Sequence, residues 1–331
     1  MLRLQIDFQT GSKERGMKIL VTGGAGFIGS HLTDRLIQLG HQVVVVDNLS
    51  TGYRHNLNPR ATFYQASLLD LELDEIFQRE QPDIVSHHAA QNDVRRSNAD
   101  PVSDAQHNII GSIRLIQYCI EHRVQKVIYA SSGGTVYGEP IYLPVDETHP
   151  VDPISPYGIS KHTVEHYLFL AYVNAGLNYT VLRYANIYGP RQHPHGGAGV
   201  VAIFAASMLK GIPPTIFGDG SSTRDYLFVE DAVAANLLAL TGGDREIYHV
   251  STGHHTSLNE LFCQLKAIIG SSVGCKKIAE MVPVYADPRS GEIHRIALSP
   301  EKIQRDLGWE PQTSLQDGLT QTIPYCRSLM S

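Results

Sequence analysis

The chain has 331 residues, of which 42% are hydrophobic and 18% are charged, and its formal net charge at pH 7 is -6. This balance is typical of a folded α/β protein and differs from that of a disordered or fibrous chain. The acidic balance offers no basic surface for nucleic acid or anionic lipid. The longest apolar runs, such as residues 43–46 and 234–240, fall well short of the roughly 20 residues that cross a bilayer, so no membrane span is expected.

The N-terminal residues and the cysteines indicate a cytoplasmic protein. Residues 1–16 have neither the apolar segment nor the cleavage site of a signal peptide, so they are predicted to form a loose leader, with Met17 as an alternative start. The cysteines lack the CxxC spacing of metal and redox sites, which indicates reduced thiols. They are Cys119, Cys263, Cys275 and Cys326. The 16 histidines include no HExxH pair, so no metal site is expected.

The expected elements alternate in the order of βαβ units on a parallel sheet. Strands are expected at residues 18–22, 42–46, 62–65, 83–87, 126–130 and 179–182. Helices are expected at residues 27–39, 71–80 and 101–122, and a further helix begins at Ser155 and Pro156. Residues 17–186 are therefore predicted to form a Rossmann-type, doubly wound domain. Gly- and Pro-rich loops then indicate a smaller α/β substrate lobe over 187–331, with a boundary that is not sharp because the chain can cross back.

A glycine-rich turn follows the first expected strand. Its spacing is GxxGxxG, with glycines at Gly23, Gly26 and Gly29. Such a turn lets the backbone approach a pyrophosphate, which then faces a helix N-terminus. Asp47 ends the second expected strand, where a carboxylate can bind the ribose hydroxyls and would repel a 2′-phosphate. The pattern predicts a dinucleotide site and favours NAD over NADP, the alternative being a glycine turn that serves packing alone.

A second group of residues predicts acid–base chemistry. Tyr157 and Lys161 lie four residues apart at the start of an expected helix and so share one face. A neighbouring ammonium stabilises a phenolate, so we expect a lowered pKa for Tyr157, which could then act as a general base. Ser131 and Ser132 follow the strand at 126–130, at the carboxyl edge of the sheet where such sites form. This combination favours catalysis over an ordinary surface pair of tyrosine and lysine.

Longer segments around these residues resemble the extended short-chain dehydrogenase/reductase family, and within it most closely the nucleotide-sugar epimerases. The resemblance covers nearly everything after residue 17. The segments that carry it are residues 22–29, 47–52, 131–138, 157–161, 182–190, 216–220, 223–226, 289–292 and 307–309.

The resemblance implies epimerisation at C4 of a UDP-hexose, such as UDP-glucose or UDP-galactose, with NAD as the cofactor. Tyr157 would remove the proton of the C4 hydroxyl while hydride passes to NAD+, and the resulting 4-keto sugar would turn over before the hydride returns. Ser132 would hydrogen-bond the C4 oxygen, and Lys161 would also hold the nicotinamide ribose. Asn186, Arg224 and Arg289 would hold the diphosphate, a role that suits the guanidinium groups, and Phe217 would contact the uracil. For Arg224 the alternative is a salt bridge with Asp225.

The resemblance also implies a set of cofactor contacts and a homodimer. The dimer would form through the helices near residues 101–122 and 157–173. The cofactor contacts would be Gly23, Gly26, Phe27, Ile28, Gly29, Asp47, Asn48, Ser67, Leu68, Asn108, Tyr157 and Lys161.

The chain departs from the family pattern at two positions. The family places its serine where this chain has Gly133, so one glycine is inserted and Ser132 takes the role by a shift, with Ser131 as the alternative. Ser67 stands where the family commonly offers an aspartate to the adenine amino group. A serine can still hydrogen-bond, so we expect altered adenine contacts and retained binding.

One position bears on the size of the sugar. In the resembling epimerases the residue seven positions after the last diphosphate arginine lines the sugar pocket, and a tyrosine there excludes N-acetylated sugars. Counting from Arg289 gives Ile296. Isoleucine is smaller, so UDP-N-acetylhexosamines are also predicted as substrates, the alternative being an ordinary packing residue.

Two other functions are weighed against epimerisation. Related dehydratases and decarboxylases act on the same 4-keto sugar, but they carry acids directly after the catalytic hydroxyl residue, where this chain has Gly133, Gly134 and Thr135. Without such an acid the intermediate can only be reduced back. A nucleotide-sensing module without turnover would have lost Tyr157 or Lys161, and both are present.

Overall fold

The computed structural model describes residues 16–194, 199–273, 276–288 and 293–329. The leader predicted for residues 1–16 lies outside the described residues, apart from Gly16. None of the helices in these ranges is both long and apolar enough to cross a membrane.

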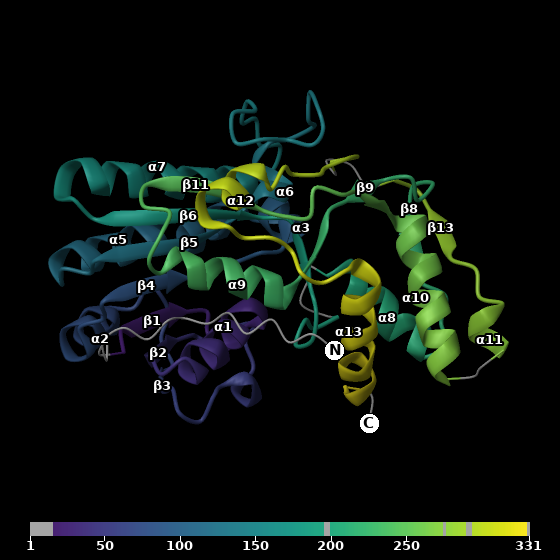
Figure 1. The fold of residues 1–331 in the computed structure, drawn as a ribbon, viewed down its shortest axis with the longest axis horizontal. Helices are drawn as coiled ribbons and strands as arrows, with labels where there is room; N and C mark the ends of the chain where they lie inside the picture. The colour runs from purple at the N-terminus through teal and green to yellow at the C-terminus, as the bar shows by residue number, and fades with distance from the viewer. Residues whose placement is uncertain (1–15, 195–198, 274–275, 289–292, 330–331) are drawn as a thin grey trace.

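A parallel sheet of seven strands forms the centre of the fold, in the order β11-β6-β5-β4-β1-β2-β3 (Figure 1). Thr22 lies opposite Val46 on one neighbouring strand and His87 on the other, so the carboxyl ends of three strands meet at one edge. The chain order reverses beside β1, and ligands of doubly wound sheets bind in the crevice at that point. The strands are β1 (Lys18–Thr22), β2 (Gln42–Val46), β3 (Thr62–Tyr64), β4 (Ile84–His87), β5 (Lys126–Ser132), β6 (Asn178–Tyr184) and β11 (Glu246–Val250).

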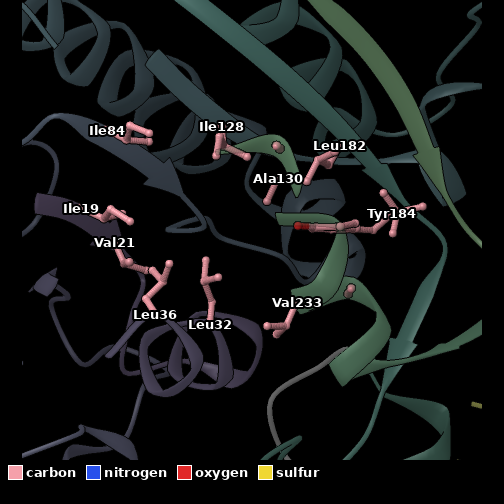
Figure 2. Close-up of a cluster of buried hydrophobic side chains, with 14 of the residues drawn as sticks. Ile19, Val21, Leu32, Leu36, Ile84, Ile128, Ala130, Leu182, Tyr184 and Val233 are labelled. Atoms are coloured by element: carbon pink, nitrogen blue, oxygen red, sulfur yellow. The ribbon is translucent and has the colours of Figure 1, made fainter. Parts of the chain in front are cut away.

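Helices cover both faces of this sheet and give three layers (Figure 1). One face carries α1 (Phe27–Gln38), α9 (Val229–Ala239) and α12 (Glu301–Leu307), and the other carries α2 (Glu72–Glu80), α5 (Gly111–Glu121) and α7 (Pro156–Ala175). The strands are rich in valine and isoleucine because both of their faces are buried. Figure 2 shows part of the cluster on the first face, including Ile19, Ile128, Leu36 and Val233.

The helix expected at residues 101–122 is divided into three parts. They are α4 (Pro101–Ala105), the π-helical segment η2 (Gln106–Ile110) and α5. Asp100 caps α4 by accepting a hydrogen bond from the Ser103 amide at 2.9 Å. Such π segments often occur at functional sites, and η2 buries Asn108 beneath the carboxyl edge of the sheet. Periodicity alone does not reveal this break.

A smaller lobe follows β6, with a core of its own around Phe204, Phe262 and Leu265. Three two-stranded sheets shape it, pairing β7 with β10, β8 with β13 and β9 with β12. Its helices are α8 (Val200–Leu209), α10 (Leu258–Val273), α11 (Lys276–Ala279) and α13 (Leu315–Ser328), and its strands are β7 (Asn186–Tyr188), β8 (Thr215–Phe217), β9 (Thr223–Arg224), β10 (Tyr226–Phe228), β12 (Thr256–Ser257) and β13 (Val284–Ala286).

The chain crosses between the two parts. β11 pairs with β6 in the central sheet, and α9 and α12 cover that sheet, so residues beyond 186 also belong to the domain built on the central sheet. The remaining short elements are η1 (Arg54–Asn56), α3 (Val94–Ala99) and α6 (Gly133–Val136).

Candidate active site

The glycine turn between β1 and α1 has no space for side chains. A Cβ at Gly29 would lie 2.4 Å from the Gly23 carbonyl oxygen, and one at Gly23 would lie 2.8 Å from the Ala89 amide nitrogen. Gly23 also has a φ of +70°, which favours glycine. Gly26 precedes α1, so the bare backbone and the first amides of the helix are open to an anion.

A cavity of about 420 Å³ lies over this turn at the carboxyl edge of the sheet, within the size range of ligand sites. Residues of β2, β5 and α7 contribute to it, together with residues of α1 and of the loops that follow β1 and β4. The predicted cofactor residues that line it are Gly23, Gly26, Phe27, Ile28, Gly29, Asp47, Asn48, Ser67, Leu68, Tyr157 and Lys161.

Asn108 is the predicted cofactor residue that does not line the cavity. Its side-chain amide donates to the Gln91 carbonyl oxygen at 2.8 Å and accepts from the Gln91 amide at 2.8 Å. Gln91 lines the cavity. Asn108 therefore supports the loop after β4 from behind.

Asp47 has two functions in this geometry. Its carboxylate accepts hydrogen bonds from the Ala25 amide at 3.0 Å and from the Leu49 amide at 2.8 Å, so it fixes the glycine turn and the loop after β2. Burial raises the pKa of Asp47, and the two amides oppose that shift. The same side chain lines the cavity, where a ribose would lie.

The catalytic residues predicted from the sequence converge at the end of this cavity. Ser155 caps α7 and Pro156 opens it, which places Tyr157 in the first turn. Ser132, at the end of β5, lies near enough to the Tyr157 hydroxyl to lower its pKa. The Ser131 hydroxyl instead donates to Glu165 at 2.6 Å, so of the two serines it is Ser132 that meets the tyrosine.

Lys161 is enclosed below Tyr157. Its ammonium donates to the Ala130 carbonyl oxygen at 2.9 Å and lies 4.9 Å from the centre of the Tyr129 ring and 5.8 Å from that of Tyr157. Burial lowers the pKa of Lys161 to about 8, and the carboxylates of Asp104 and Glu165 oppose that shift. Lys161 is therefore mostly protonated at neutral pH, and it loses its proton at a lower pH than an ordinary lysine does.

The prediction that the pKa of Tyr157 is lowered is wrong for the protein without a bound cofactor. Burial raises this pKa above its ordinary value, the Asp104 carboxylate adds to the rise, and the hydrogen bond with Ser132 offsets part of it. Desolvation of the phenolate outweighs the neighbouring ammonium. Tyr157 needs a further positive charge beside it to become a base near neutral pH.

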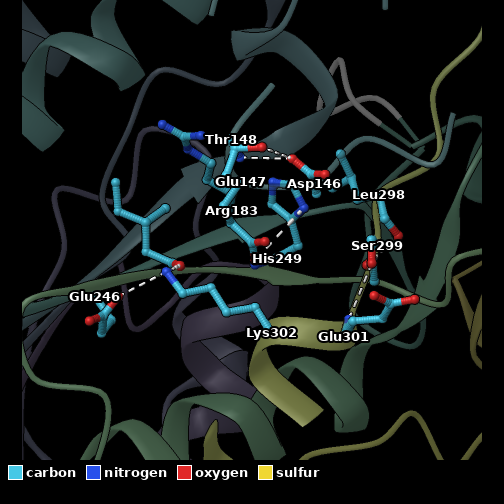
Figure 3. Close-up of polar contacts among 12 residues, drawn as sticks. Asp146, Glu147, Thr148, Arg183, Glu246, His249, Leu298, Ser299, Glu301 and Lys302 are labelled. Carbon is cyan, nitrogen blue, oxygen red and sulfur yellow. Dashed lines mark hydrogen bonds and ion pairs between the residues drawn. The ribbon is translucent and has the colours of Figure 1, made fainter. Parts of the chain in front are cut away.

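A buried polar network that the sequence did not reveal lies behind β5. Arg183 on β6 donates to both oxygens of Glu165 and also to the Tyr137 hydroxyl, and that hydroxyl shares a hydrogen bond of 2.5 Å with His249 Nε2. Figure 3 shows Arg183, His249 and Glu147 close together, and the Glu147 carboxylate accepts a hydrogen bond from the His249 amide at 2.8 Å. Because Glu165 also holds Ser131, the network fixes the end of the strand that carries Ser132. The charge of Arg183 within an apolar strand was the signal available in the sequence.

The residues predicted to bind the UDP end lie at the small lobe. Asn186 begins β7, with its side-chain oxygen close to Gly134, and Phe217 ends β8 beside an open hollow lined by Gly218, Tyr285 and Pro288. Arg289 lies outside the described residues.

Arg224 is not paired with Asp225. Its guanidinium donates to the Thr223 carbonyl oxygen at 2.8 Å and to that of His294 at 3.4 Å, and it forms no ion pair within the described ranges. The Asp225 carboxylate accepts from the Thr252 hydroxyl and from backbone amides instead. Arg224 therefore keeps donors for an anionic ligand.

Ile296 is placed differently from the sequence-based expectation. Its side chain is 1% exposed and packs with Val136, Val145 and Leu298. A side chain so enclosed offers no surface to a ligand in this structure, which favours the packing interpretation. A Cβ at Gly133 would meet the end of the Leu298 side chain, so a larger residue there would have to displace part of the same cluster.

Comparisons with known proteins agree with this geometry. The profile described as "NAD dependent epimerase/dehydratase family" matches residues 19–251. A putative UDP-glucose 4-epimerase of Methanocaldococcus jannaschii is 45% identical, over 94% of this chain and 98% of its own.

Two solved structures have the same fold. UDP-glucose 4-epimerase of Thermotoga maritima with UDP-glucose has a TM-score of 0.91 at 48% identity, covering 95% of this chain and 100% of that one. The Thermus thermophilus enzyme in complex with NAD has a TM-score of 0.88 at 41% identity, covering 94% and 99%. The chain belongs to the NAD-dependent epimerase/dehydratase family.

Proposed function

We propose that the protein is an NAD-dependent 4-epimerase that interconverts UDP-glucose and UDP-galactose. The observation that carries the proposal is that Tyr157 and Lys161 lie together, with 5.8 Å between the ammonium and the ring centre, in a cavity floored by the glycine turn. Ser132 ends the neighbouring strand β5 and acts on the Tyr157 hydroxyl. The similarity to UDP-glucose 4-epimerases over almost the whole chain supports this substrate.

The described residues fit a bound NAD. The glycine turn and the N-terminus of α1 would hold the pyrophosphate, and Asp47 would hold the adenosine ribose while disfavouring a 2′-phosphate. Ser67 lines the adenine end without a carboxylate. Bound NAD+ would supply a hydride acceptor, and its positive charge would favour the phenolate that burial alone disfavours.

The chain's own residues have separate roles in the reaction at the sugar C4. Tyr157 takes the proton of the C4 hydroxyl and returns one when the ketone is reduced, and Ser132 holds the C4 oxygen by a hydrogen bond. Lys161 stabilises the phenolate by its charge. At the other end of the substrate, Asn186, Arg224 and Arg289 hold the diphosphate and Phe217 contacts the uracil.

Dehydration or decarboxylation requires a further acid next to the sugar, and the structure opposes one at the usual place. An acidic side chain at position 133 would have to displace the end of the buried Leu298 side chain, which a Cβ there would already meet. The carboxylate of Glu165 is held by Arg183 and Ser131. Reduction of the 4-keto sugar is therefore the outcome that the site favours.

The experiment is to incubate the purified protein with UDP-galactose, UDP-glucuronate and dTDP-glucose and to identify the products by NMR. Conversion of UDP-galactose to UDP-glucose supports the proposal, and a 4-keto-6-deoxy product or loss of carbon dioxide contradicts it. Tyr157→Phe should lower the turnover by about 100-fold or more while NAD binding persists. Tyr172→Phe on the same helix, whose hydroxyl accepts from Arg245, is the matched control and should leave turnover unchanged.

We further propose a homodimer through α5 and α7. These helices pack on each other and present apolar side chains outward, among them Phe169, Leu170 and Val173, which are each about half exposed. Light scattering should give twice the monomer mass, and Leu170→Glu should shift the protein to the monomer. A monomeric wild type would contradict this assembly.

We also place the enzyme in the cytoplasm. Cys119, Cys263 and Cys326 are free thiols, as expected of a reducing compartment. Fractionation of the source cells tests this location, and recovery outside the cytoplasm would contradict it.

A further inference from the structure

Asp104 on α4 is a buried carboxylate to which the proposed function gives no role. The residue is 1% exposed, and its two oxygens accept three hydrogen bonds. One oxygen accepts from Asn108 at 2.9 Å and from Gln91 at 3.1 Å, and the other accepts from the Ser160 hydroxyl at 2.6 Å. A buried carboxylate is costly unless it is both hydrogen-bonded and paired with a cation, and Asp104 has the hydrogen bonds but no ion pair with a described residue.

These three bonds connect Asp104 to the catalytic end of the cavity from different elements. Ser160 precedes Lys161 on α7, Gln91 lines the cavity after β4, and Asn108 holds the backbone of Gln91 from η2. A displacement of Asp104 would therefore shift both α7, which carries Tyr157 and Lys161, and the wall of the cavity at Gln91.

Two carboxylates act on Lys161, and of these Asp104 is the one whose negative charge is not neutralised by an ion pair with a described residue. Glu165, the other carboxylate that acts on Lys161, is already paired with Arg183 at 2.5 Å. Asp104 forms no ion pair within the described part of the chain. On the β4 side, burial and the charge of Lys161 lower the pKa values of His87 and His88, that of His88 to about 4, so neither ring supplies a cation at neutral pH.

The remaining groups that face Lys161 are phenols. Tyr129 on β5 is fully buried and neutral, because burial raises its pKa well above the ordinary value. Tyr157 is the second, and it experiences the field of Asp104 as well. Arg96 on α3, which packs on α4, also lines the cavity, and Lys161 is the cation whose charged form Asp104 stabilises. Tyr157 is a group whose ionisation that carboxylate opposes.

We propose that Asp104 is a positioning residue that sets the pH range of catalysis, because its buried negative charge acts on both Tyr157 and Lys161 while its hydrogen bonds hold Ser160 and Gln91. This inference rests on the proposed function of the pair. The carboxylate stabilises the protonated form of both groups, so it keeps Lys161 charged and makes Tyr157 harder to ionise.

The sign of the effect can be worked out for each limb of a bell-shaped profile. Activity rises on the acid side as the tyrosine gives up its proton and falls on the alkaline side as the lysine does. Removing the negative charge lowers the pKa of both groups. Both limbs should therefore move to lower pH together, although the apparent values belong to the coupled pair.

The test is the pH profile of kcat/KM for UDP-galactose with the NAD-loaded wild type and Asp104→Asn, which keeps the size of the side chain. Both limbs should shift downward by on the order of one pH unit. Asp100→Asn is the matched control, since Asp100 is an exposed cap on the same helix, and its limbs should stay in place. Asp104→Glu restores the charge and should return the limbs towards the wild-type positions.

Each outcome is decisive. Lower activity of Asp104→Asn with unmoved limbs would show a structural role only and overturn the inference. If Asp104→Asn does not fold, the profile is measured on Asp104→Ser, and failure of both to fold would likewise overturn it, because the carboxylate would then be a requirement of folding. A wild type that converts no UDP-galactose would refute the proposed function itself, which is a different result.

Discussion

Replacement of Gly29 by alanine should weaken NAD binding. The new Cβ would lie 2.4 Å from the Gly23 carbonyl oxygen, inside the 3.0 Å below which such contacts essentially do not occur. Both contacting groups are backbone, so α1 and the turn must move apart. Overpacking of this kind costs about 1–3 kcal/mol, and if the displaced turn carries the strain, NAD affinity falls roughly 5- to 150-fold.

Calorimetric titration of NAD into the stripped protein measures this effect, with thermal unfolding as a second readout. Gly270→Ala is the matched control because Gly270 also lies in a helix, and a Cβ there meets nothing within 4 Å. It should stabilise the fold by up to about 1 kcal/mol through helix propensity and leave NAD affinity unchanged. Unaltered NAD affinity in Gly29→Ala would refute the close approach of the pyrophosphate to the turn.

Three further predictions concern the site and the network behind it. Ser132→Ala should lower turnover by about 100-fold or more, whereas Ser131→Ala should chiefly lower the melting temperature, and the reverse pattern would reassign the catalytic serine. Burial raises the pKa of Glu165, but hydrogen bonds from His162 and Arg183 outweigh burial and hold this pKa at about 2, below its ordinary 4.5. The stability that the ionised carboxylate contributes should therefore be lost as the pH falls from 4.5 to about 2. Thermal melts between these pH values check it, and Glu165→Gln should flatten the dependence. Asp47→Asn should narrow the preference for NAD over NADP in binding titrations, and equal wild-type affinities would contradict the repulsion of a 2′-phosphate.

The local motifs predicted much of the fold and of the site. Gly23, Asp47 and Tyr157 each act within a short segment whose spacing determines its geometry, so the cavity could be predicted without coordinates. Six of the seven strands of the central sheet, and the helices α1, α2 and α7, were predicted for the same reason, because their periodicity reports burial on one or two faces. Strand β11 and the helices and strands of the smaller lobe were not predicted individually.

Other features depend on contacts between distant segments. Ile296 was assigned to a pocket by counting along the chain, but its burial depends on packing against Val136 and Leu298. The raised pKa of Tyr157 follows from desolvation, which a sequence does not show. Asp104 and Glu165 lie on helices, and only the folded chain shows that Glu165 forms an ion pair with Arg183 whereas Asp104 forms none with any described residue.

The central claim is that one enzyme-bound nicotinamide takes the hydride from C4 and returns it to the same carbon. The most direct test is to convert UDP-galactose labelled with deuterium at C4 in ordinary water and to follow the label by NMR. We predict that the UDP-glucose formed keeps its deuterium at C4 and that no NADH accumulates during the conversion. Loss of the label to solvent, or NADH released in proportion to product, would contradict the account.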